Sequence, residues 1–277
     1  MNTLTETRKT DGKGYGVFAL QPLKRGTIIY TEEPILSFDK PSHLVSPADL
    51  ELAVKKLGAA DRKAVLALHR GTSVRFASKL KAIYHANSFG DQESSSLYLK
   101  ISRINHSCIP NAVVTEWHAV IALKDIAEGE ELEISYLNDR ISGWTARQRK
   151  ALLEMHYGFE CRCIACRPTE FMRLSECRRK LITHLRYALD GSPPDYSRFE
   201  NIVLTRTPDP PAPRWRPLTE VQRIEYTFLL ACLYEAEGQC PAQQVAELLA
   251  RRNYVLTLVK DENHSRCGLR RVQYQFS

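Results

Sequence analysis

The sequence predicts an α+β fold in which a β-rich first part is followed by a smaller helical part. Short runs of β-branched and aromatic residues, separated by glycine-containing turns, occur on both sides of a helical stretch before Cys166. Beyond Cys166 the apolar residues follow the spacing of amphipathic helices. The chain has 277 residues, of which 43% are hydrophobic and 26% charged, enough for a proper core. This composition excludes a disordered, collagen-like or coiled-coil chain.

Two strands are predicted near the start, at Tyr15–Leu20 and at Thr27–Tyr30, each entered from a turn that contains glycine. A helical insert of about residues 40–86 follows, because apolar residues such as Leu50 and Val54 recur there at helical spacing. The strand pattern then returns, and the sequence predicts three more short strands, at Ala112–Thr115, Val120–Leu123 and Leu132–Tyr136.

The remaining elements are predicted to be helices. Thr145 can cap a helix that runs from Thr145 to His156. Helical spacing further predicts helices at Glu170–Leu189, Thr219–Glu237 and Ala242–Lys260. Five prolines at 207–217 exclude a continuous helix or a central strand there, so this stretch is predicted to be a linker.

Charge and hydropathy narrow the range of partners. The net charge is +7, but Lys and Arg are spread evenly and form no dense tract, so we expect no direct nucleic-acid binding. No apolar run approaches the ~18 residues of a membrane helix. The polar stretch Met1–Asp11 lacks the apolar core of a secretory signal. We therefore expect no membrane association and an intracellular location, in the nucleus, the cytoplasm or both.

A cysteine cluster is the strongest chemical signal. Cys161, Cys163 and Cys166 place three thiols within six residues. Zinc prefers four tetrahedral ligands, and closely spaced thiolates let one loop supply most of them. A reducing compartment favours a metal over disulfides for such a cluster. The other cysteines outside this region, Cys177, Cys232, Cys240 and Cys267, lack ligand-like spacing and are expected to pack as small apolar residues.

Three further segments stand out. Gly12–Gly16 has the spacing GxGxG and leads into a strand, which does not fit the dinucleotide fingerprint but would let backbone approach a ligand closely. The segment Arg103–Asn111 contains Asn, His, Ser and Cys in succession, and these residue types are unfavourable inside a helix or strand. In Glu128–Tyr136, a turn is followed by a strand of alternating polar and apolar residues that ends at Tyr136.

Together these segments resemble a SET-domain methyltransferase. The glycine loop, the Asn105–Asn111 segment, Gly129–Tyr136 and the trailing cysteines occur in the family's order between Lys13 and Cys166. Asn87-Ser88-Phe89, Tyr157–Glu160 and the helical C-terminal part are similar to the SET-and-MYND branch. The chain departs from that branch because Phe38–Leu80, where the MYND zinc module would fall, contains no cysteine.

The resemblance implies a β-rich SET fold of small sheets with a knot-like crossing, a helical insert, a post-SET zinc loop and a small α-helical C-terminal region. It implies a SET domain at 1–157 with the insert at about 40–86, and a post-SET zinc-binding segment at 158–167. A helical C-terminal region would follow at 168–277, with the proline-rich linker at about 207–217.

The resemblance also implies the site residues. One structural Zn²⁺ would be bound by the cysteine set Cys108, Cys161, Cys163 and Cys166. Tyr136 would be the catalytic tyrosine, and Tyr157 would line the channel for the target lysine. S-adenosylmethionine would be held by a group of residues from several segments: Lys13, Gly14, Tyr15, Asn87, Asn105, His106, Tyr136 and Phe159.

The implied activity is S-adenosylmethionine-dependent protein-lysine N-methylation, with a protein or peptide that carries the target lysine as substrate. A free lysine has a pKa of about 10.4 and is mostly protonated at neutral pH. An apolar aromatic channel disfavours the ammonium form by desolvation, so aromatic residues suit the reaction. Two alternatives stay open: a non-catalytic SET-fold interaction module, and a methyltransferase acting on a small-molecule acceptor.

Overall fold

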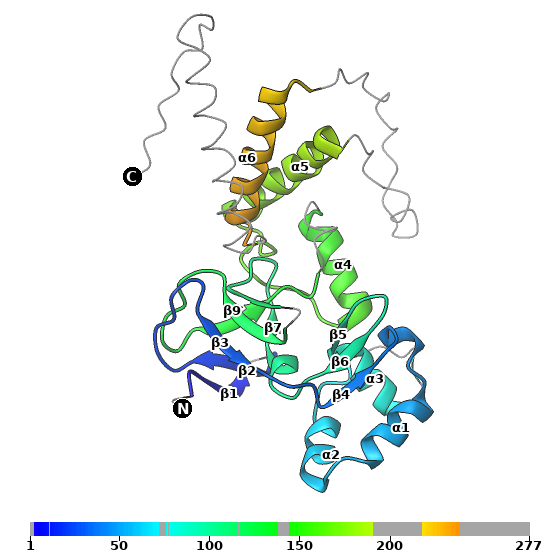
Figure 1. Cartoon of the computed structure of the whole chain (residues 1–277). Coiled ribbons are helices and arrows are strands. Elements are labelled where there is room, and N and C mark those ends of the chain that lie inside the picture. The colour runs from blue at the N-terminus through cyan, green and yellow to red at the C-terminus, as the bar shows by residue number, and fades with distance from the viewer. Residues whose placement is uncertain are drawn as a thin grey trace, which may run out of the picture.

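The computed structural model describes residues 3–10, 12–71, 76, 78–115, 117–137, 144–190 and 218–238. Two sequence predictions lie outside these ranges: the helix at 242–260 and the proline-rich linker at 207–217. Cys240 and Cys267 also lie outside them. Within the described residues the fold is α+β, with three small sheets in one part of the molecule and two long helices on top (Figure 1).

The sheet that carries the site has the strand order β1-β2-β10-β7. Its strands are β1 (Thr5–Thr10), β2 (Gly14–Ala19), β10 (Glu131–Ile134) and β7 (Asn105–His106). The short strand β7 runs parallel to β10, which sets Asn105 beside Glu133 and His106 beside Ile134. Residues far apart in the sequence thereby become neighbours at one edge of the sheet.

Two three-stranded sheets complete the β structure. One has the order β3 (Ile28–Thr31), β9 (Ala119–Ala122) and β8 (Ala112–Val114). The other has the order β4 (Leu36–Phe38), β6 (Ser95–Leu97) and β5 (Ser88–Gly90). The first two sheets share a core of fully buried residues such as Val17, Val120 and Leu132.

The strands differ from the sequence prediction in four places. β7 was not predicted, because its polar residues Asn105 and His106 are unfavourable inside a strand. β1 was not predicted, because its pattern is polar and only Thr5 is buried. β10 ends at Ile134 rather than at Tyr136. The strands of the β4-β6-β5 sheet are three residues long, too short to show an alternating pattern. The knot-like crossing stays a prediction.

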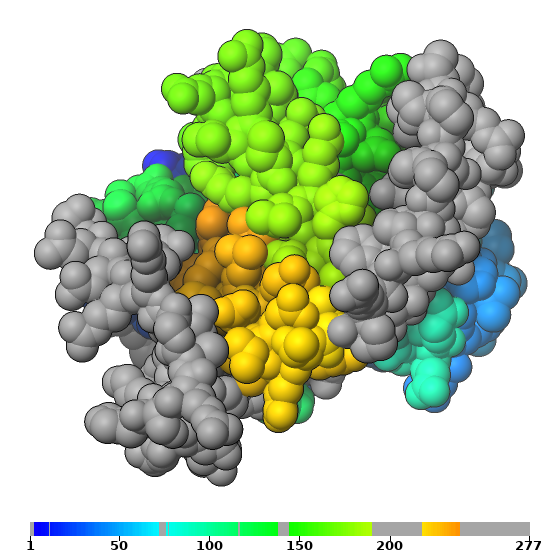
Figure 2. Space-filling model, turned by 90° about the horizontal axis from the view of Figure 1, so that it is seen from above, coloured from blue at the N-terminus to red at the C-terminus, as the bar shows by residue number. Residues whose placement is uncertain are grey.

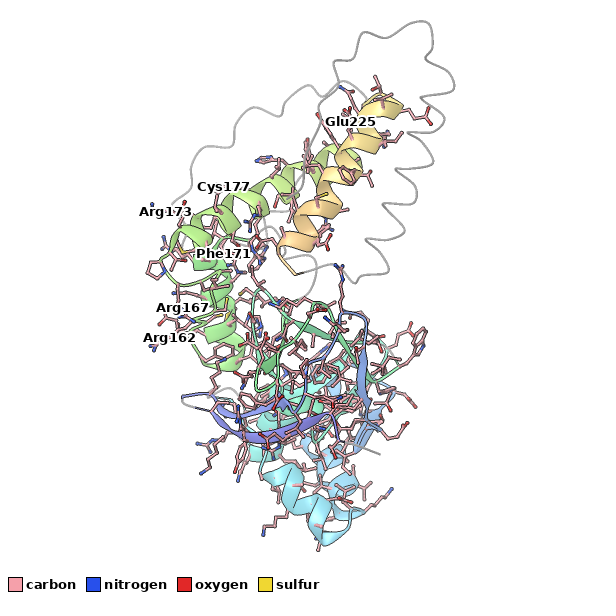
Figure 3. All side chains as sticks on the ribbon, turned by 90° about the vertical axis from the view of Figure 1, so that its left-hand side faces the viewer. Arg162, Arg167, Phe171, Arg173, Cys177 and Glu225 are labelled. Carbon is pink, nitrogen blue, oxygen red and sulfur yellow. The ribbon has the colours of Figure 1, made fainter. Side chains whose placement is uncertain are left out.

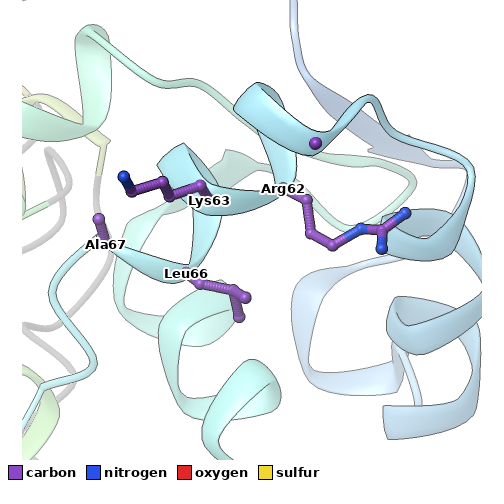
Figure 4. A pocket seen from close by; sticks show the side chains of 5 residues that line it. Arg62, Lys63, Leu66 and Ala67 are labelled. Atoms are coloured by element: carbon purple, nitrogen blue, oxygen red, sulfur yellow. The ribbon is translucent and has the colours of Figure 1, made fainter.

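The helical insert consists of α1 (Pro47–Lys55), α2 (Ala59–Leu66) and α3 (Lys79–Asn87), as its apolar spacing predicts. Their apolar faces meet in a separate core that includes Leu50, Val65 and Ile83. The ammonium of Lys81 ties this unit to the short helix η1 (Ser42–Leu44) by donating to the carbonyls of Ser42 and Val45. A shallow hollow on α2 is shown in Figure 4, and no predicted site residue lines it.

Three helices follow the last strand: α4 (Ala146–Tyr157), α5 (Glu170–Asp190) and α6 (Glu220–Ala236). Thr145 caps α4 through a capping box with Gln148, which confirms the predicted start. α5 and α6 pack side by side above the sheets (Figures 1 and 2). No helix among the described residues is long and apolar enough to cross a membrane.

The expectation of apolar packing is wrong for Cys177 on α5 and Cys232 on α6, because both residues are exposed. Cys177 lies on the same side of the molecule as Phe171 and Arg173 (Figure 3). Arg162 and Arg167, from the cysteine loop, also face this side and are exposed.

Candidate functional site

The four cysteines predicted to bind zinc lie together. The sulfur atoms of Cys108, Cys161, Cys163 and Cys166 all lie within 4.8 Å of one another. The sulfur of Cys108 is 3.9 Å from that of Cys161 and 3.6 Å from that of Cys166. A tetrahedral zinc with bonds of ~2.3 Å to sulfur requires sulfur atoms ~3.8 Å apart. The donor set and its spacing therefore fit one zinc ion.

A buried arginine from α4 faces this cluster. Arg149 is 0% exposed, and one of its terminal nitrogens lies 3.5 Å from the sulfur of Cys166 and 2.8 Å from the carbonyl oxygen of Ala165. Its other terminal nitrogen donates to the carbonyl of Trp144 at 2.5 Å. A guanidinium buried among neutral carbonyls needs a negative charge nearby, and the cysteines would supply one if a metal ionised them.

A second buried arginine approaches from α5. Arg179 is 1% exposed and donates to the carbonyl oxygen of Cys108 at 2.7 Å. Its Nε forms an ion pair of 2.8 Å with Glu237, a carboxylate that is 0% exposed. The hydroxyl of Ser175 donates to the same carboxylate at 2.6 Å. The backbone of the cysteine segment is thus held from the C-terminal helices.

His106 joins the cysteine cluster to the predicted cofactor residues. Its Nδ1 accepts a hydrogen bond of 3.0 Å from the backbone N–H of Tyr136. Nδ1 therefore carries no hydrogen, and the neutral ring bears its proton on Nε2, which lies 3.3 Å from the sulfur of Cys108. Burial lowers the pKa of His106 to about 3, so the ring is neutral at physiological pH.

Four rings form an aromatic cluster beside this histidine, made of His106, Tyr136, Tyr157 and Phe159. The ring of Tyr136 lies 5.0 Å from that of Tyr157 and 5.2 Å from that of His106, between centroids. The ring of Phe159 lies 6.3 Å from Tyr136 and 6.0 Å from His106. Three of the rings keep part of their surface exposed and only His106 is buried, so the cluster can be approached from solvent.

The two tyrosines of the aromatic cluster are neutral phenols. The hydroxyl of Tyr136 donates to the carbonyl oxygen of Ile104 at 2.7 Å. Burial raises the pKa of Tyr136 and that of Tyr157 above the ordinary value of a tyrosine. A buried neutral hydroxyl held by a backbone carbonyl is suited to orient a ligand rather than to act as a base.

The glycine loop meets the sheet through acidic residues of β10. The ammonium of Lys13 lies 3.0 Å from the carboxylate of Glu131 and 2.8 Å from that of Glu133. The side-chain amide of Asn105 donates to Glu131 at 2.6 Å and to the carbonyl of Tyr15 at 3.1 Å. Lys13, Tyr15 and Asn105 are therefore brought together.

Gly16 allows this close approach. A Cβ atom at Gly16 would lie 2.4 Å from a carboxylate oxygen of Glu131 and 3.1 Å from the side-chain nitrogen of Asn105. Gly14 has φ +82°, a conformation that favours glycine. The glycine loop thus provides backbone without side chains next to Asn105.

Asn87 is the predicted site residue that these contacts do not include. Its side-chain amide donates to the carbonyls of His69 and Ile83, at 2.6 and 2.7 Å, within the helical insert. Its backbone carbonyl accepts from Ser102 at 3.0 Å, three residues before Asn105.

Tyr15 is 45% exposed, with the guanidinium of Arg103 4.9 Å from its ring centroid.

Sequence reasoning missed the charged residues that support the site: Glu131, Glu133, Arg149, Arg179 and Glu237. The sequence contains an indication that Arg149 is buried, because this residue lies on the same helix face as the buried residues Ala146 and Leu153. A charged residue on an apolar helix face is rarely buried without a partner. The others become partners only through contacts between distant segments.

The chain is similar in sequence to a known domain and to several known proteins. Residues 14–137 match the model of the SET domain. The chain is 29% identical over 180 residues to histone-lysine N-methyltransferase set5 of Schizosaccharomyces pombe, covering 62% of this chain and 54% of that protein. It is 39% identical over 79 residues to histone-lysine N-methyltransferase ATXR4 of Arabidopsis thaliana, covering 27% of this chain and 23% of that protein.

The chain is also 42% identical over 73 residues to histone-lysine N-methyltransferase SMYD3 of Homo sapiens, covering 25% of this chain and 16% of that protein. It therefore spans about half the length of the first of these relatives and less of the other two. The family resemblance and the SET fold class predicted from the sequence are confirmed.

Proposed function

We propose, from the SET domain that residues 14–137 form, that this chain is an S-adenosylmethionine-dependent protein-lysine N-methyltransferase with one structural zinc. The observation that carries the proposal is the position of His106. The ring of His106 packs against the ring of Tyr136 in the aromatic cluster, with 5.2 Å between centroids. Its Nε2 lies 3.3 Å from the sulfur of Cys108. A metal site and an aromatic site thus share one buried residue.

The described residues fit the cofactor. S-adenosylmethionine supplies an electrophilic methyl group on a positively charged sulfur, and cations are attracted to aromatic faces. The rings of Tyr136, Phe159 and His106 provide such faces. The glycine loop presents Lys13, Gly14 and Tyr15 beside Asn105. With Asn87 from the insert, these are the residues that we assign to cofactor binding.

Tyr136 and Tyr157 would prepare the target lysine. Their rings lie 5.0 Å apart and form an apolar wall that disfavours an ammonium ion, so the lysine loses its proton before it reacts. The Tyr136 hydroxyl, which donates to the Ile104 carbonyl at 2.7 Å, would orient the neutral amine. Good alignment of two reacting groups lowers a barrier by ~7–11 kcal/mol.

The zinc would have a structural role in the site. Cys108 follows the cofactor segment Asn105–His106, whereas Cys161, Cys163 and Cys166 follow Phe159. One ion bound to all four thiolates would therefore hold two sides of the cofactor site together. The metal would thus add to the small core in which Cys161, Ala165 and Cys166 of the post-SET segment 158–167 pack against α4.

The substrate class rests on the relatives. Their names describe histone-lysine N-methyltransferases, so histone tails are the first substrates to test, and a nuclear or cytoplasmic location is expected. The relatives match the chain over only part of their own length, so this assignment concerns the SET domain. Evenly spread charge supports neither direct nucleic-acid binding nor a membrane partner.

The test is transfer of a radioactive methyl group from S-adenosylmethionine to a peptide array that includes histone tails. Wild type should label peptides that contain lysine. Tyr136→Phe should bind the cofactor with nearly unchanged affinity in calorimetry, yet lose at least 100-fold in labelling. Tyr30→Phe is the matched control, because the buried Tyr30 hydroxyl has no hydrogen-bond partner among the described residues.

The outcomes separate the alternatives. Cofactor binding without labelling of any peptide or amine would favour a non-catalytic interaction module. Labelling of small amines in preference to peptides would favour a small-molecule acceptor. Undiminished labelling by Tyr136→Phe would remove Tyr136 from the mechanism.

A further inference from the structure

The C-terminal end of α6 contacts the cysteine segment. Glu237, the C-cap residue of α6, is fully buried and accepts from Arg179 on α5. The next residue, Gly238, packs so closely that a Cβ there would lie 2.9 Å from the carbonyl oxygen of Pro110. This end of the helix pair therefore contacts residues 108–110, which lie within the SET-domain match at 14–137, whereas α5 and α6 lie beyond it.

Hydrogen bonds continue from this contact to the aromatic cluster. Arg179 donates to the carbonyl of Cys108 at 2.7 Å. The sulfur of Cys108 lies 3.3 Å from Nε2 of His106, and Nδ1 of His106 accepts from the N–H of Tyr136 at 3.0 Å. Five residues from four separate segments thus form one connected series: Glu237, Arg179, Cys108, His106 and Tyr136.

We propose that Glu237 and Arg179 are positioning residues that hold the metal-binding Cys108, and through it His106 and Tyr136, in place. The C-terminal helix pair would then act as a brace for the metal centre. The inference rests on the proposed function only for the presence of zinc and for the role of Tyr136.

Arg179 and Glu237 are expected to hold Cys108 in place because their ion pair is almost completely buried. A buried charge that loses its partner is strongly unfavourable, so removal of the Glu237 charge is expected to move Arg179 away from Cys108. Residues that hold metal ligands from behind typically change metal affinity by about 10–100-fold when they are replaced. Ser175 and Arg178 also bind the Glu237 carboxylate, at 2.6 and 3.0 Å, which fixes its orientation.

The experiment uses the full chain loaded with zinc and measures the rate of zinc transfer to a chromogenic chelator. Glu237→Gln should release zinc at least about tenfold faster than wild type. Glu235→Gln is the matched control, since Glu235 lies on the same helix, is 43% exposed and pairs with Arg25. This variant should release zinc at the wild-type rate. Hydrogen exchange of the Tyr136 amide should accelerate in the first variant only.

A double variant, Glu237→Gln with Arg179→Met, separates positioning from plain stability. It removes both fully buried charges, and Arg178, which also loses its partner, keeps 26% of its side chain exposed, so the Tm should recover most of the loss seen in Glu237→Gln. Its zinc release should remain fast, because the hydrogen bond from Arg179 to the Cys108 carbonyl is lost. If Glu237→Gln does not fold, this double variant provides the same measurement.

Release at the wild-type rate in Glu237→Gln would overturn the inference, as would a double variant that recovers both Tm and zinc retention. A wild-type chain that binds no zinc would overturn the metal assignment and the inference together. If zinc release changes as expected but the wild-type chain transfers no methyl group, only the proposed function would be contradicted.

Discussion

The guanidinium of Arg149 lies 3.5 Å from the sulfur of Cys166, and no carboxylate forms an ion pair with it among the described residues. Four thiolates around one Zn²⁺ carry a net charge of about −2, whereas four thiols carry none. A fully buried arginine at this position is therefore expected to be the counter-ion of an ionised, metal-bound cluster.

Replacing this arginine should weaken metal binding. Arg149→Gln keeps hydrogen-bond donors but removes the charge, and we expect zinc affinity in a chelator competition to fall by about 10–100-fold. Arg147→Gln, on an exposed part of α4, is the control and should leave the affinity unchanged. Equal affinities in the two variants would show that the charge of Arg149 does not compensate the cluster.

A methyl group at Gly16 should disturb the cofactor site. Gly16→Ala would force Glu131 away from Asn105 and Lys13, because the new Cβ would lie 2.4 Å from a Glu131 oxygen. We expect S-adenosylmethionine affinity in calorimetry to fall about tenfold, with a loss of ~1–3 kcal/mol in the free energy of unfolding.

Gly58→Ala is the control for Gly16→Ala, since the nearest atom to its added Cβ is 4.0 Å away. This variant should keep both its cofactor affinity and its stability. Wild-type cofactor affinity in Gly16→Ala would show that the contact between Glu131 and Asn105 does not matter for binding.

Phe159 should contribute to cofactor affinity through its ring. Phe159→Leu keeps an apolar side chain but removes the aromatic face next to His106 and Tyr136. Contacts of a cation with an aromatic face are worth ~0.5–2 kcal/mol, so the Kd for S-adenosylmethionine should rise about 2–30-fold.

The control for Phe159 is Phe38→Leu at the end of β4, where the Phe38 ring packs against Tyr84 of the insert at 5.5 Å between centroids. It should lower thermal stability and leave the Kd unchanged. A Phe159→Leu chain with the Kd of wild type would place the cofactor elsewhere.

The pH dependence of methyl transfer follows from the state of the tyrosines. Burial raises the pKa of Tyr136, so its phenol stays protonated up to at least about pH 10. The target lysine becomes more deprotonated as the pH rises, so single-turnover rates should increase from pH 7 to pH 9.5. A rate that declines in this range, while the circular dichroism spectrum is unchanged, would show that Tyr136 ionises early.

Local signals predicted the helices well. Thr145 and Gln148 form the capping box that begins α4, and Thr219 with Gln222 does the same for α6. Both motifs act within four residues, so the sequence contains the whole interaction. The cysteine cluster was predictable for a similar reason, since three of its four sulfurs come from one short loop.

Long-range contacts were not predictable in the same way. The pairing of Asn105 with Glu133 depends on a parallel contact between strands that are two and four residues long. The ion pairs of Lys13 join residues more than 100 positions apart, and neither partner has a distinctive pattern. Family resemblance supplied the roles of Asn105 and His106, whereas only the structure shows what surrounds them.

The polar strand β1 has a consequence for how the molecule behaves at high concentration. It is the outer strand of its sheet, and its exposed residues include Glu6, Arg8 and Lys9. An outer strand with free backbone groups is a template for aggregation, and charged side chains discourage a second chain from adding to it. The same lack of a hydrophobic pattern that makes β1 hard to find in the sequence is thus expected to disfavour pairing of this strand with a second chain.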